Sequence, residues 1–400
     1  MNHQQMDASE IEARLTEAAR VFYHVTVEDE LTSTNTTLKQ MAAVNAASDG
    51  SAPCKSVPNG SVPCGSVPCG TVLIARRQTG GRGRLGRTFH SPSGSGLYMS
   101  VLVRPNDTAS LHSLDEADRH TKPQSMPLIT PSLHASDTPD CHTKPQCKPL
   151  IIPSLHASDT PDCHTKPQNM PLIIPSLHAS DALYLTTGTA AAVAKAIDTV
   201  RILPIVRAHD AAREAAASDT LASPAKIKWV NDIYLSHSDG IPKKVCGILC
   251  EAALKPGTTA LSYAVIGIGV NLLPPPDGFP PDIAKTATSV FTAEEEALCD
   301  GNDLAAAILN LLYPLFTDPK NPDYQAEYRS RSLLDGKRIF VRPSSSLGGA
   351  EIPATALGLD EELGLLVRYD NGEEAVLRSG EVIMQDDSVV LGGDSVHLLR

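Results

Sequence analysis

The chain of 400 residues has few aromatic residues, no long apolar run and no excess of positive charge. Phe, Trp and Tyr together make up 4% of it, and Trp229 is the single tryptophan. No apolar stretch approaches the ~20 residues that span a bilayer, and the polar N-terminus does not resemble a signal peptide. A formal net charge of −12 argues against a general nucleic-acid binder, which usually carries a basic domain. We therefore expect a cytoplasmic protein without membrane or nucleic-acid partners.

Cysteine is present, but not in a pattern typical of disulfides. Of the nine cysteines, six lie inside short repeats, and Cys246, Cys250 and Cys299 lie in apolar or helical contexts. An odd number of cysteines in such contexts favours a reduced compartment. The hydrophobic content of 42% is sufficient for a core, and the length allows about two domains.

Two tracts of low-complexity repeats interrupt the chain. Residues 51–70 consist of four five-residue units such as SVPCG, and residues 110–181 repeat with a period of 22. The longer units are rich in proline and poor in apolar residues, which is typical of a disordered or extended insertion rather than of a solenoid. Their Cys-His dipeptides lack the spacing of a zinc site. Since the cost of loop closure grows slowly with length, we expect deletion of 110–181 to preserve the fold.

Positive charge is concentrated in one glycine-rich stretch, TGGRGRLGR at residues 79–87. It follows TVLIARRQ at 71–78 and precedes GLYMSVLVRP at 96–105, both of which have the pattern of a strand, while 182–200 has helical spacing. Glycine lets a ligand approach the backbone, and exposed N–H groups and arginine side chains match phosphate oxygens. Taken alone, the stretch is equally compatible with a phosphate-binding loop and with a flexible surface loop.

Three later segments also have ordinary explanations when each is taken alone. An Asn-Asp pair in IKWVNDIYL at 227–235 is typical of a turn, and the lysines of KKVCGILCEA at 243–252 are typical of a sheet edge. Glycines interrupt the apolar strand YAVIGIGVNLL at 263–273, which indicates either a bulge or the close approach of a ligand.

In this order, the motifs resemble those of the biotin protein ligases. The resemblance rests on STN at 33–35, QTGGRGRLGRTFHSPSGSGLY at 78–98, KWVND at 228–232, KKVCGIL at 243–249, IGIGVNL at 266–272, FPPDIAKTATSV at 279–290 and a C-terminal segment at 333–382. The family often has Trp where Phe89 stands and Pro where Val230 stands. Both replacements keep an apolar side chain.

The resemblance implies an α+β fold with a mixed sheet like that of class II aminoacyl-tRNA synthetases, helices on one side of it, and a small C-terminal SH3-like β-barrel. A catalytic domain that binds biotin and ATP would occupy 1–330, with the repeat insertions at 51–70 and 110–181. The SH3-like domain would occupy 333–385, followed by a tail at 386–400. Only about 30 residues precede Ser33, too few for a winged helix, so we expect a monofunctional form without a DNA-binding domain.

The implied activity is that of a biotin–[biotin carboxyl-carrier protein] ligase with two steps. Biotin and ATP, with Mg²⁺, give biotinyl-5′-AMP, which then passes biotin to a lysine of a biotin carboxyl carrier protein or domain. A homodimer is left open. One alternative is a lipoate or octanoate ligase or transferase of the same superfamily, whose members lack the arginine-glycine loop. Another is a non-catalytic biotin-binding regulator, in which Lys244 or the arginines could be lost.

The resemblance also assigns site residues. The catalytic residues would be Lys244, Arg84 and Arg82, because cations must neutralise charge on the phosphoryl oxygens. Biotin would contact Ser33, Thr34, Asn35, Gln78, Arg82, Gly83, Arg84, Lys244, Gly267 and Gly269, and the glycines would let the site floor come close. ATP or the adenylate would contact Arg84, Arg87, Asn231, Asp232 and Asn271. Asp232 is the candidate for holding Mg²⁺ and for the base of the second step, whereas Lys243 would point away from the site.

Overall fold

The computed structural model describes residues 6–46, 67–105, 174–207, 223–342 and 351–385. All of these belong to one compact unit, and a second unit, 107–171, lies outside the described residues.

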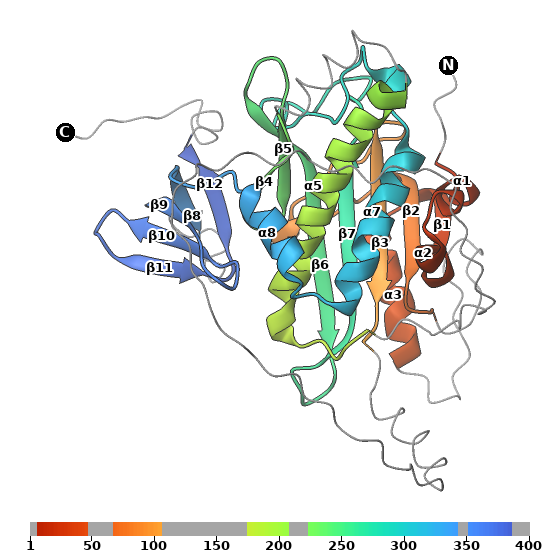
Figure 1. The fold of residues 1–400 in the computed structure, drawn as a ribbon, viewed down its shortest axis with the longest axis horizontal. Helices are drawn as coiled ribbons and strands as arrows, with labels where there is room; N and C mark the ends of the chain where they lie inside the picture. The colour runs from red at the N-terminus through yellow and green to blue at the C-terminus, as the bar shows by residue number, and fades with distance from the viewer. Residues whose placement is uncertain (1–5, 47–66, 106–173, 208–222, 343–350, 386–400) are drawn as a thin grey trace, which may run out of the picture. The chain divides into compact units, whose positions relative to one another are not determined.

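A seven-stranded mixed sheet forms the centre of this unit (Figure 1). Its strands follow the order β1 (His24–Leu31), β2 (Thr71–Gln78), β3 (Gly96–Val103), β7 (Leu261–Asn271), β6 (Pro242–Leu254), β5 (Asp232–Ser236) and β4 (Lys226–Lys228). β1 and β2 are parallel, and the other neighbouring strands are antiparallel. The prediction of an α+β fold around a large mixed sheet is confirmed.

Six α-helices are described with this sheet. They are α1 (Ala8–Ala13), α2 (Glu17–Phe22), α3 (Thr34–Ala46), α5 (Ala182–Arg207), α7 (Gly301–Thr317) and α8 (Pro322–Ser330). None of the described helices has both the length and the apolar character needed to cross a bilayer.

Helices cover both faces of the sheet, so the expectation of helices on one side is wrong. Leu102 of β3 packs with Leu38 of α3 in a small separate core. Its neighbours Val101 and Val103 belong to the main core, together with residues of α5 and α7. Because successive residues of a strand point to opposite faces, α3 lies on one face and the α5–α7 pair on the other.

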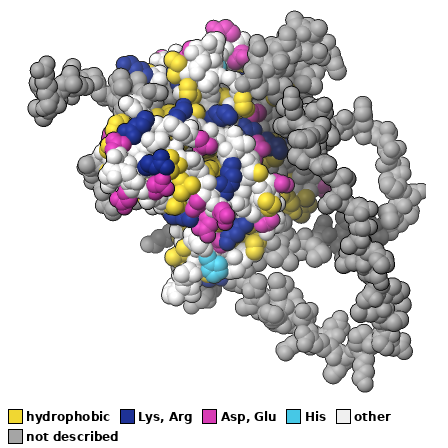
Figure 2. Space-filling view, turned by 60° about the vertical axis from the view of Figure 1, so that its left-hand side comes forward, with side chains coloured by type: hydrophobic (Ala, Val, Ile, Leu, Met, Phe, Trp, Pro, Cys, Tyr) yellow, Lys and Arg dark blue, Asp and Glu magenta, His cyan; other side chains and the backbone are white. Residues whose placement is uncertain are grey.

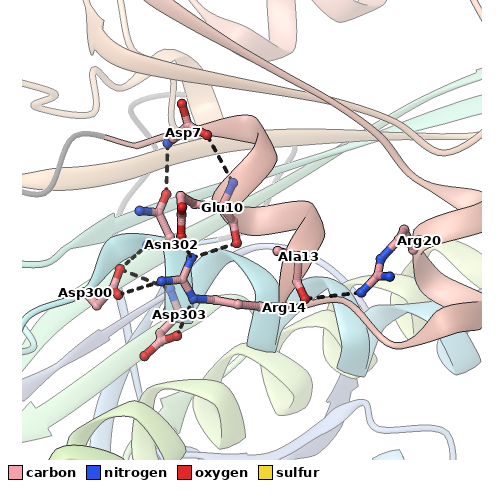
Figure 3. A network of polar contacts seen from close by, with 8 residues as sticks. All are labelled: Asp7, Glu10, Ala13, Arg14, Arg20, Asp300, Asn302 and Asp303. Carbon is pink, nitrogen blue, oxygen red and sulfur yellow. Dashed lines mark hydrogen bonds and ion pairs between the residues drawn. The ribbon is translucent and has the colours of Figure 1, made fainter.

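Polar contacts hold the N-terminal helices against the start of α7 (Figure 3). The guanidinium of Arg14 lies 2.8 Å from a carboxylate oxygen of Asp303 and 3.3 Å from one of Asp300. The Asp7 backbone N–H donates to the Asn302 side-chain oxygen at 2.9 Å. The segment before β1 is therefore an integral part of the same folded unit.

The end of the longer repeat tract also belongs to the fold. Ile174 and Leu177, in its last copy, are 1% and 2% exposed and lie in the main core. The backbone oxygen of Leu177 accepts a hydrogen bond from Leu261 of β7 at 2.7 Å. The expectation that the insertion extends to residue 181 is therefore wrong, because 174–181 supplies core and backbone pairing. The predicted insertion at 110–173 lies outside the described residues.

The shorter tract likewise ends inside the fold. The Gly70 N–H donates to the Leu102 backbone oxygen at 2.9 Å. Gly70 has a φ of 82°, and a Cβ there would lie 2.3 Å from the Phe22 carbonyl oxygen. The last glycine of this tract is thus required by the turn into β2. The predicted insertion at 51–66 lies outside the described residues.

A second, five-stranded antiparallel sheet follows α8. It has the order β11 (Glu374–Leu377), β10 (Leu365–Tyr369), β9 (Ile352–Leu359), β8 (Arg338–Arg342) and β12 (Glu381–Met384). Basic and acidic side chains are intermixed on the side of the molecule shown in Figure 2. Arg338 of β8 forms an ion pair with Asp370 at 2.7 Å. The Trp229 indole N–H donates to the Leu363 backbone oxygen at 3.0 Å. The SH3-like assignment of this sheet stays a prediction, and the predicted tail, 386–400, lies outside the described residues.

Candidate active site

The predicted site residues gather on the face of the sheet that carries α3. Val265 of β7 packs under α3. Gly267 and Gly269 follow on the same face, because residues two apart in a strand point the same way. Gly267 lies opposite Ser100 of β3, and Gly269 lies opposite Gly247 of β6. On this face, α3 therefore covers the sheet at Val265, and glycines line the part of β7 that follows.

A buried hydrogen-bond network forms one end of the site. The Thr34 N–H donates to the Gln78 side-chain oxygen at 2.9 Å, and the Ser100 hydroxyl lies 2.8 Å from the Thr34 hydroxyl. Ser100 donates to Asn35 Oδ1 at 2.6 Å. Ser33, Thr34 and Asn35 are only 2–4% exposed. We call Ser33, Thr34, Asn35, Gln78 and Ser100 the polar cluster; it brings four predicted biotin-binding residues together.

The two strand glycines make room for protein side chains. A Cβ on Gly267 would lie 2.2 Å from Asn35 Oδ1, and a Cβ on Gly269 would lie 2.7 Å from the Phe89 ring. The same ring also lies beside Gly247, next to the Lys244 side chain. The structure thus explains both glycines by the packing of Asn35 and Phe89, and their contact with a ligand stays a prediction.

The arginine loop, which we define as residues 79–91, has backbone hydrogen bonds between its two arms and a tight turn at its tip. The Gly83 N–H donates to the Arg87 backbone oxygen at 2.7 Å, and the Phe89 N–H donates to Gly81 at 2.9 Å. The tip is a single 3₁₀ turn, Arg84–Gly86. Backbone hydrogen bonds therefore hold this glycine-rich stretch in a defined hairpin between β2 and β3.

Arg84 lies at the predicted nucleotide end of the site. Its guanidinium donates to Asn231 Oδ1 at 2.9 Å and to the Gly380 backbone oxygen at 2.8 Å. Burial raises the pKa of the Tyr328 hydroxyl. The positive charge of Arg84 lowers this pKa, and the negative charge of Asp232 raises it further. Through its bond to Asn231, Arg84 contacts the residue that directly precedes Asp232 in the chain. Within the described residues Arg84 makes no ion pair, so its charge remains available to an anion.

The other two arginines of the loop are paired with carboxylates. The Arg82 guanidinium lies 3.3 Å from a Glu251 carboxylate oxygen. Arg87 forms an ion pair with Glu381 of β12, which also pairs with Arg342 at 2.8 Å. Arg87 is thus directed to the second sheet, and its predicted contact with ATP stays a prediction.

Lys244 pairs with Asp232 across the β5–β6 pair. Its Nζ lies 2.8 Å from Asp232 Oδ1. Lys243 instead pairs with Asp239 at 2.8 Å, in the turn between β5 and β6. The two adjacent lysines therefore face different groups, and Lys244 is the one beside Gly247 and the Phe89 ring.

Asn271 reaches the site from the end of β7. Its side-chain N–H donates to the Thr288 backbone oxygen at 3.0 Å. The Thr288 N–H in turn donates to the Lys244 backbone oxygen at 2.9 Å. The segment around Thr288 thus connects Asn271 to the strand that carries Lys244.

Asp232 supplies a carboxylate for a divalent metal at this end of the site. Asp232 is the predicted ligand, and one of its oxygens is engaged by Lys244. The described ranges contain no group of three acidic, His or Cys side chains suited to a metal ion. Mg²⁺ commonly binds through one or two carboxylates together with substrate phosphates, so Asp232 fits a metal that arrives on a nucleotide.

Ser100 and Glu251 were not predicted from the sequence, although both contact predicted residues. Ser100 stands within the apolar strand GLYMSVLV, and Glu251 follows the apolar run GILC. A polar residue that interrupts an apolar strand is the signal that could have identified them, because buried polar groups require hydrogen-bond partners.

A family model supports the resemblance. Residues 53–116 match the Biotin/lipoate A/B protein ligase family. The chain is 30% identical over 159 residues to the biotin--[acetyl-CoA-carboxylase] ligase of Mycobacterium tuberculosis, an alignment that covers 39% of this chain and 52% of that protein. The chain thus spans about half the length of this curated relative.

Two further comparisons extend over most of the chain. It is 25% identical over 357 residues to the bifunctional ligase/repressor BirA of Bacillus subtilis, which covers 87% of this chain and 70% of that protein. The structure of a biotin protein ligase from Aquifex aeolicus in complex with biotin and ATP aligns with 91% of this chain and 99% of that chain, with 20% identity and a TM-score of 0.48. By its ordered motifs, the family match over residues 53–116 and the curated relatives, the chain is similar to the biotin/lipoate A/B protein ligase family and, within it, to the biotin protein ligases.

Proposed function

We propose that the chain is an ATP-dependent biotin protein ligase that forms biotinyl-5′-AMP and transfers biotin to a lysine of a biotin carboxyl carrier protein or domain. The observation that carries this proposal is the arrangement on the α3 face of the sheet. An uncharged, buried polar cluster lies at one end of the site, and the cations Lys244 and Arg84 lie at the other. This arrangement suits a ligand that has an uncharged polar ring at one end and a carboxylate, next to a phosphate, at the other.

The polar cluster would hold the ureido ring of biotin. Amides and hydroxyls supply both donors and acceptors for its N–H and C=O groups. Thr34 and Ser100 already orient Gln78 and Asn35 by hydrogen bonds. A ligand would therefore meet side chains that need little reordering, which favours affinity.

In the first step, a biotin carboxylate oxygen attacks the α-phosphorus of ATP and pyrophosphate leaves. The carboxylate is ionised at neutral pH, so the step needs no general base. Positive groups must offset the approach of two anions and the charge that spreads over the phosphoryl oxygens. Lys244 would hold the carboxylate and Arg84 the phosphate. Mg²⁺ bound with ATP would supply further positive charge to the phosphates, with Asp232 as its protein ligand.

In the second step, the amine of the carrier lysine attacks the biotinyl carbonyl carbon and AMP leaves. An ordinary lysine has a pKa of ~10.4, so a proton must be removed from it. Asp232 is the carboxylate that stands next to Lys244 and would accept this proton.

A carrier-labelling experiment tests the proposal. The protein is incubated with ATP, Mg²⁺, a biotin carboxyl carrier domain and either biotin or lipoate. We expect biotin on the target lysine, and none on a carrier whose target lysine is replaced by arginine. Modification that requires lipoate instead of biotin would contradict the proposal.

Replacing Arg84 is expected to release the activated intermediate. Arg84→Ala removes the loop cation that makes no ion pair in the described residues and leaves the polar cluster intact. Biotinyl-AMP should dissociate about tenfold faster, because hydrogen bonds to charged groups contribute roughly 1.5–3 kcal/mol. The measurement is biotin incorporation into lysines of an added bystander protein. Arg87→Ala, which removes the Glu381 pair, is the matched loop variant, and equal leakage from both variants would contradict a special role for Arg84.

Adding one methyl group at Gly267 is expected to weaken biotin binding. The new Cβ would occupy the position of Asn35 Oδ1, so Asn35 must leave Ser100 and the Leu249 backbone oxygen. Losing these two hydrogen bonds, at about 1 kcal/mol each, should raise the biotin Kd roughly thirtyfold for Gly267→Ala. Calorimetric titration with biotin measures this. Ser100→Ala, which removes one of the bonds without adding bulk, should give a smaller change in the same direction. Unchanged affinity in a folded Gly267→Ala protein would rule out Asn35 as a contact of the biotin site.

A further inference from the structure

Glu251 connects the polar cluster to the arginine loop. It lies on β6 opposite Val265, on the face of the sheet that carries α3. One of its carboxylate oxygens accepts a hydrogen bond from Lys39 of α3 at 2.6 Å and lies 3.3 Å from the Arg82 guanidinium. Its other oxygen accepts from the Asn35 side-chain N–H at 3.1 Å. A single carboxylate thus joins a residue of the proposed biotin site to a cation of the loop.

The environment of Glu251 keeps it ionised. Burial would raise the pKa of its carboxyl group, since the side chain is 18% exposed. Hydrogen bonds from Lys39 and Asn35 and the charges of Lys39 and Arg82 outweigh burial, so the pKa is lowered from its ordinary value. The group therefore carries a full negative charge whenever the site is at neutral pH.

The contacts of Glu251 with Lys39, Asn35 and Arg82 differ in length and in exposure to solvent. Lys39 makes the shortest contact and links α3 to β6. The Arg82 side chain is 43% exposed, and its contacts with the two oxygens are 3.3 and 3.4 Å. Arg82 is thus the partner that a change at Asn35 or at the ligand can most easily shift, because exposed ion pairs are weak and readily exchanged.

We propose that Glu251 is a positioning residue that couples Asn35 in the biotin site to Arg82 on the arginine loop, so that occupation of the site and the position of the loop depend on each other. This proposal rests on the proposed function for the nature of the ligand. Asn35 is held between Ser100 and Glu251, so a ligand that bonds to Asn35 changes the position of the carboxylate that Arg82 contacts. The arginine loop then closes more firmly over an occupied site than over an empty one.

Limited trypsin digestion of the full chain tests the coupling without requiring catalysis. Cleavage after Arg84 and Arg87 is quantified by mass spectrometry, with and without biotin, at a temperature below the melting point of every variant. We expect Glu251→Gln to be cut in the loop about threefold to fivefold faster than the wild type, the range that corresponds to one exposed ion pair. Biotin should protect the wild-type loop and protect the loop of Glu251→Gln less.

Lys39→Gln is the matched control, because it removes one partner of Glu251 and leaves the Arg82 contact. Its loop should be cut at the wild-type rate. Arg82→Gln breaks the same contact from the loop side, and the Arg82→Gln/Glu251→Gln double variant should be cut no faster than Arg82→Gln alone. Equal loop cleavage in Lys39→Gln and Glu251→Gln would show that Glu251 only anchors α3, and additive effects in the double variant would show that the two residues act independently.

A kinetic measurement separates this proposal from the proposed function. Glu251→Gln should raise the KM for biotin and speed the release of biotinyl-AMP, each about threefold to fivefold, while Lys39→Gln changes neither. Unchanged KM and release in Glu251→Gln would overturn the coupling. If the wild type forms no biotinyl-AMP, the proposed function fails, and the digestion without ligand still decides whether Glu251 positions Arg82.

Discussion

Replacing Lys244 with alanine is expected to lower the rate of biotinyl-AMP formation by something on the order of 10²–10³-fold, the loss typical of one preorganised electrostatic group. Lys244 lies beside Gly247 and the Phe89 ring, where it can meet a carboxylate. Its ion pair with Asp232 adds to the effect, because removing the lysine leaves a negative charge at the place where two anions must approach. Quench-flow measurement of adenylate formation gives the rate.

Two further variants show whether the effect belongs to Lys244 itself. Lys243→Ala removes the neighbouring cation, which pairs with Asp239 away from the site, and should leave the rate unchanged. Lys244→Arg should not restore it fully, because a broad guanidinium does not replace a compact ammonium. A wild-type rate in Lys244→Ala with an unchanged melting curve would make Lys243 the next candidate.

Deleting the whole repeat tract is expected to abolish folding, whereas deleting most of it is not. Removal of 110–181 takes away Ile174 and Leu177, whose loss from a core costs about 2–5 kcal/mol each. It also removes the backbone pairing of Leu177 with Leu261. Together these losses approach the 5–15 kcal/mol that holds a typical domain folded. Replacing 110–170 by a short Gly/Ser linker keeps Ile174 and Leu177. This variant should have the melting temperature and the activity of the wild type.

The repeats themselves provide a matched control for this experiment. Residues 149–159 and 171–181 have the same sequence, PLIIPSLHASD. Deleting 160–181 therefore removes 174–181 but places an identical segment directly before Ala182. We expect this variant to fold and to keep its activity. A soluble, active protein after deletion of 110–181 would show that the segment is dispensable, and a misfolded protein after deletion of 160–181 would show that the repeat sequence alone is not sufficient.

The local elements of the fold could be predicted from sequence patterns. The strand expected at 71–78 is β2, the strand at 96–105 contains β3, and the helix at 182–200 lies within α5. These segments have strong alternation or helical spacing, which depends only on near neighbours. The faces that the helices cover could not be predicted, because that depends on how α3 returns over the sheet.

The boundary of the repeat tract could not be predicted either. Composition treats the copies at 149–159 and 171–181 alike, since their sequences are identical. The second copy is followed directly by α5 and lies next to β7, which gives Leu177 a backbone partner and a core. A segment of low apolar content can thus be ordered by its attachment to a folded element, although composition alone predicts disorder.

Motif resemblance proposes residues for the site but does not predict which residues they contact. The contacts of Glu251 with Asn35 and Arg82 join residues more than 160 positions apart in the chain. The pairing of Arg87 with Glu381 likewise depends on the second sheet. Such long-range contacts leave no periodic signal in a single sequence, so only the folded chain shows that most cations of the site already have carboxylate partners.

Mass spectrometry of the small molecules formed from biotin, ATP and Mg²⁺ tests whether the chain activates biotin as an adenylate. The purified protein is incubated with these substrates without a carrier, and in parallel with lipoate in place of biotin. We expect biotinyl-5′-AMP and an equal amount of pyrophosphate with biotin, and no lipoyl-AMP with lipoate. A folded protein that forms no biotinyl-5′-AMP, or that forms an adenylate only with lipoate, would contradict the proposed function.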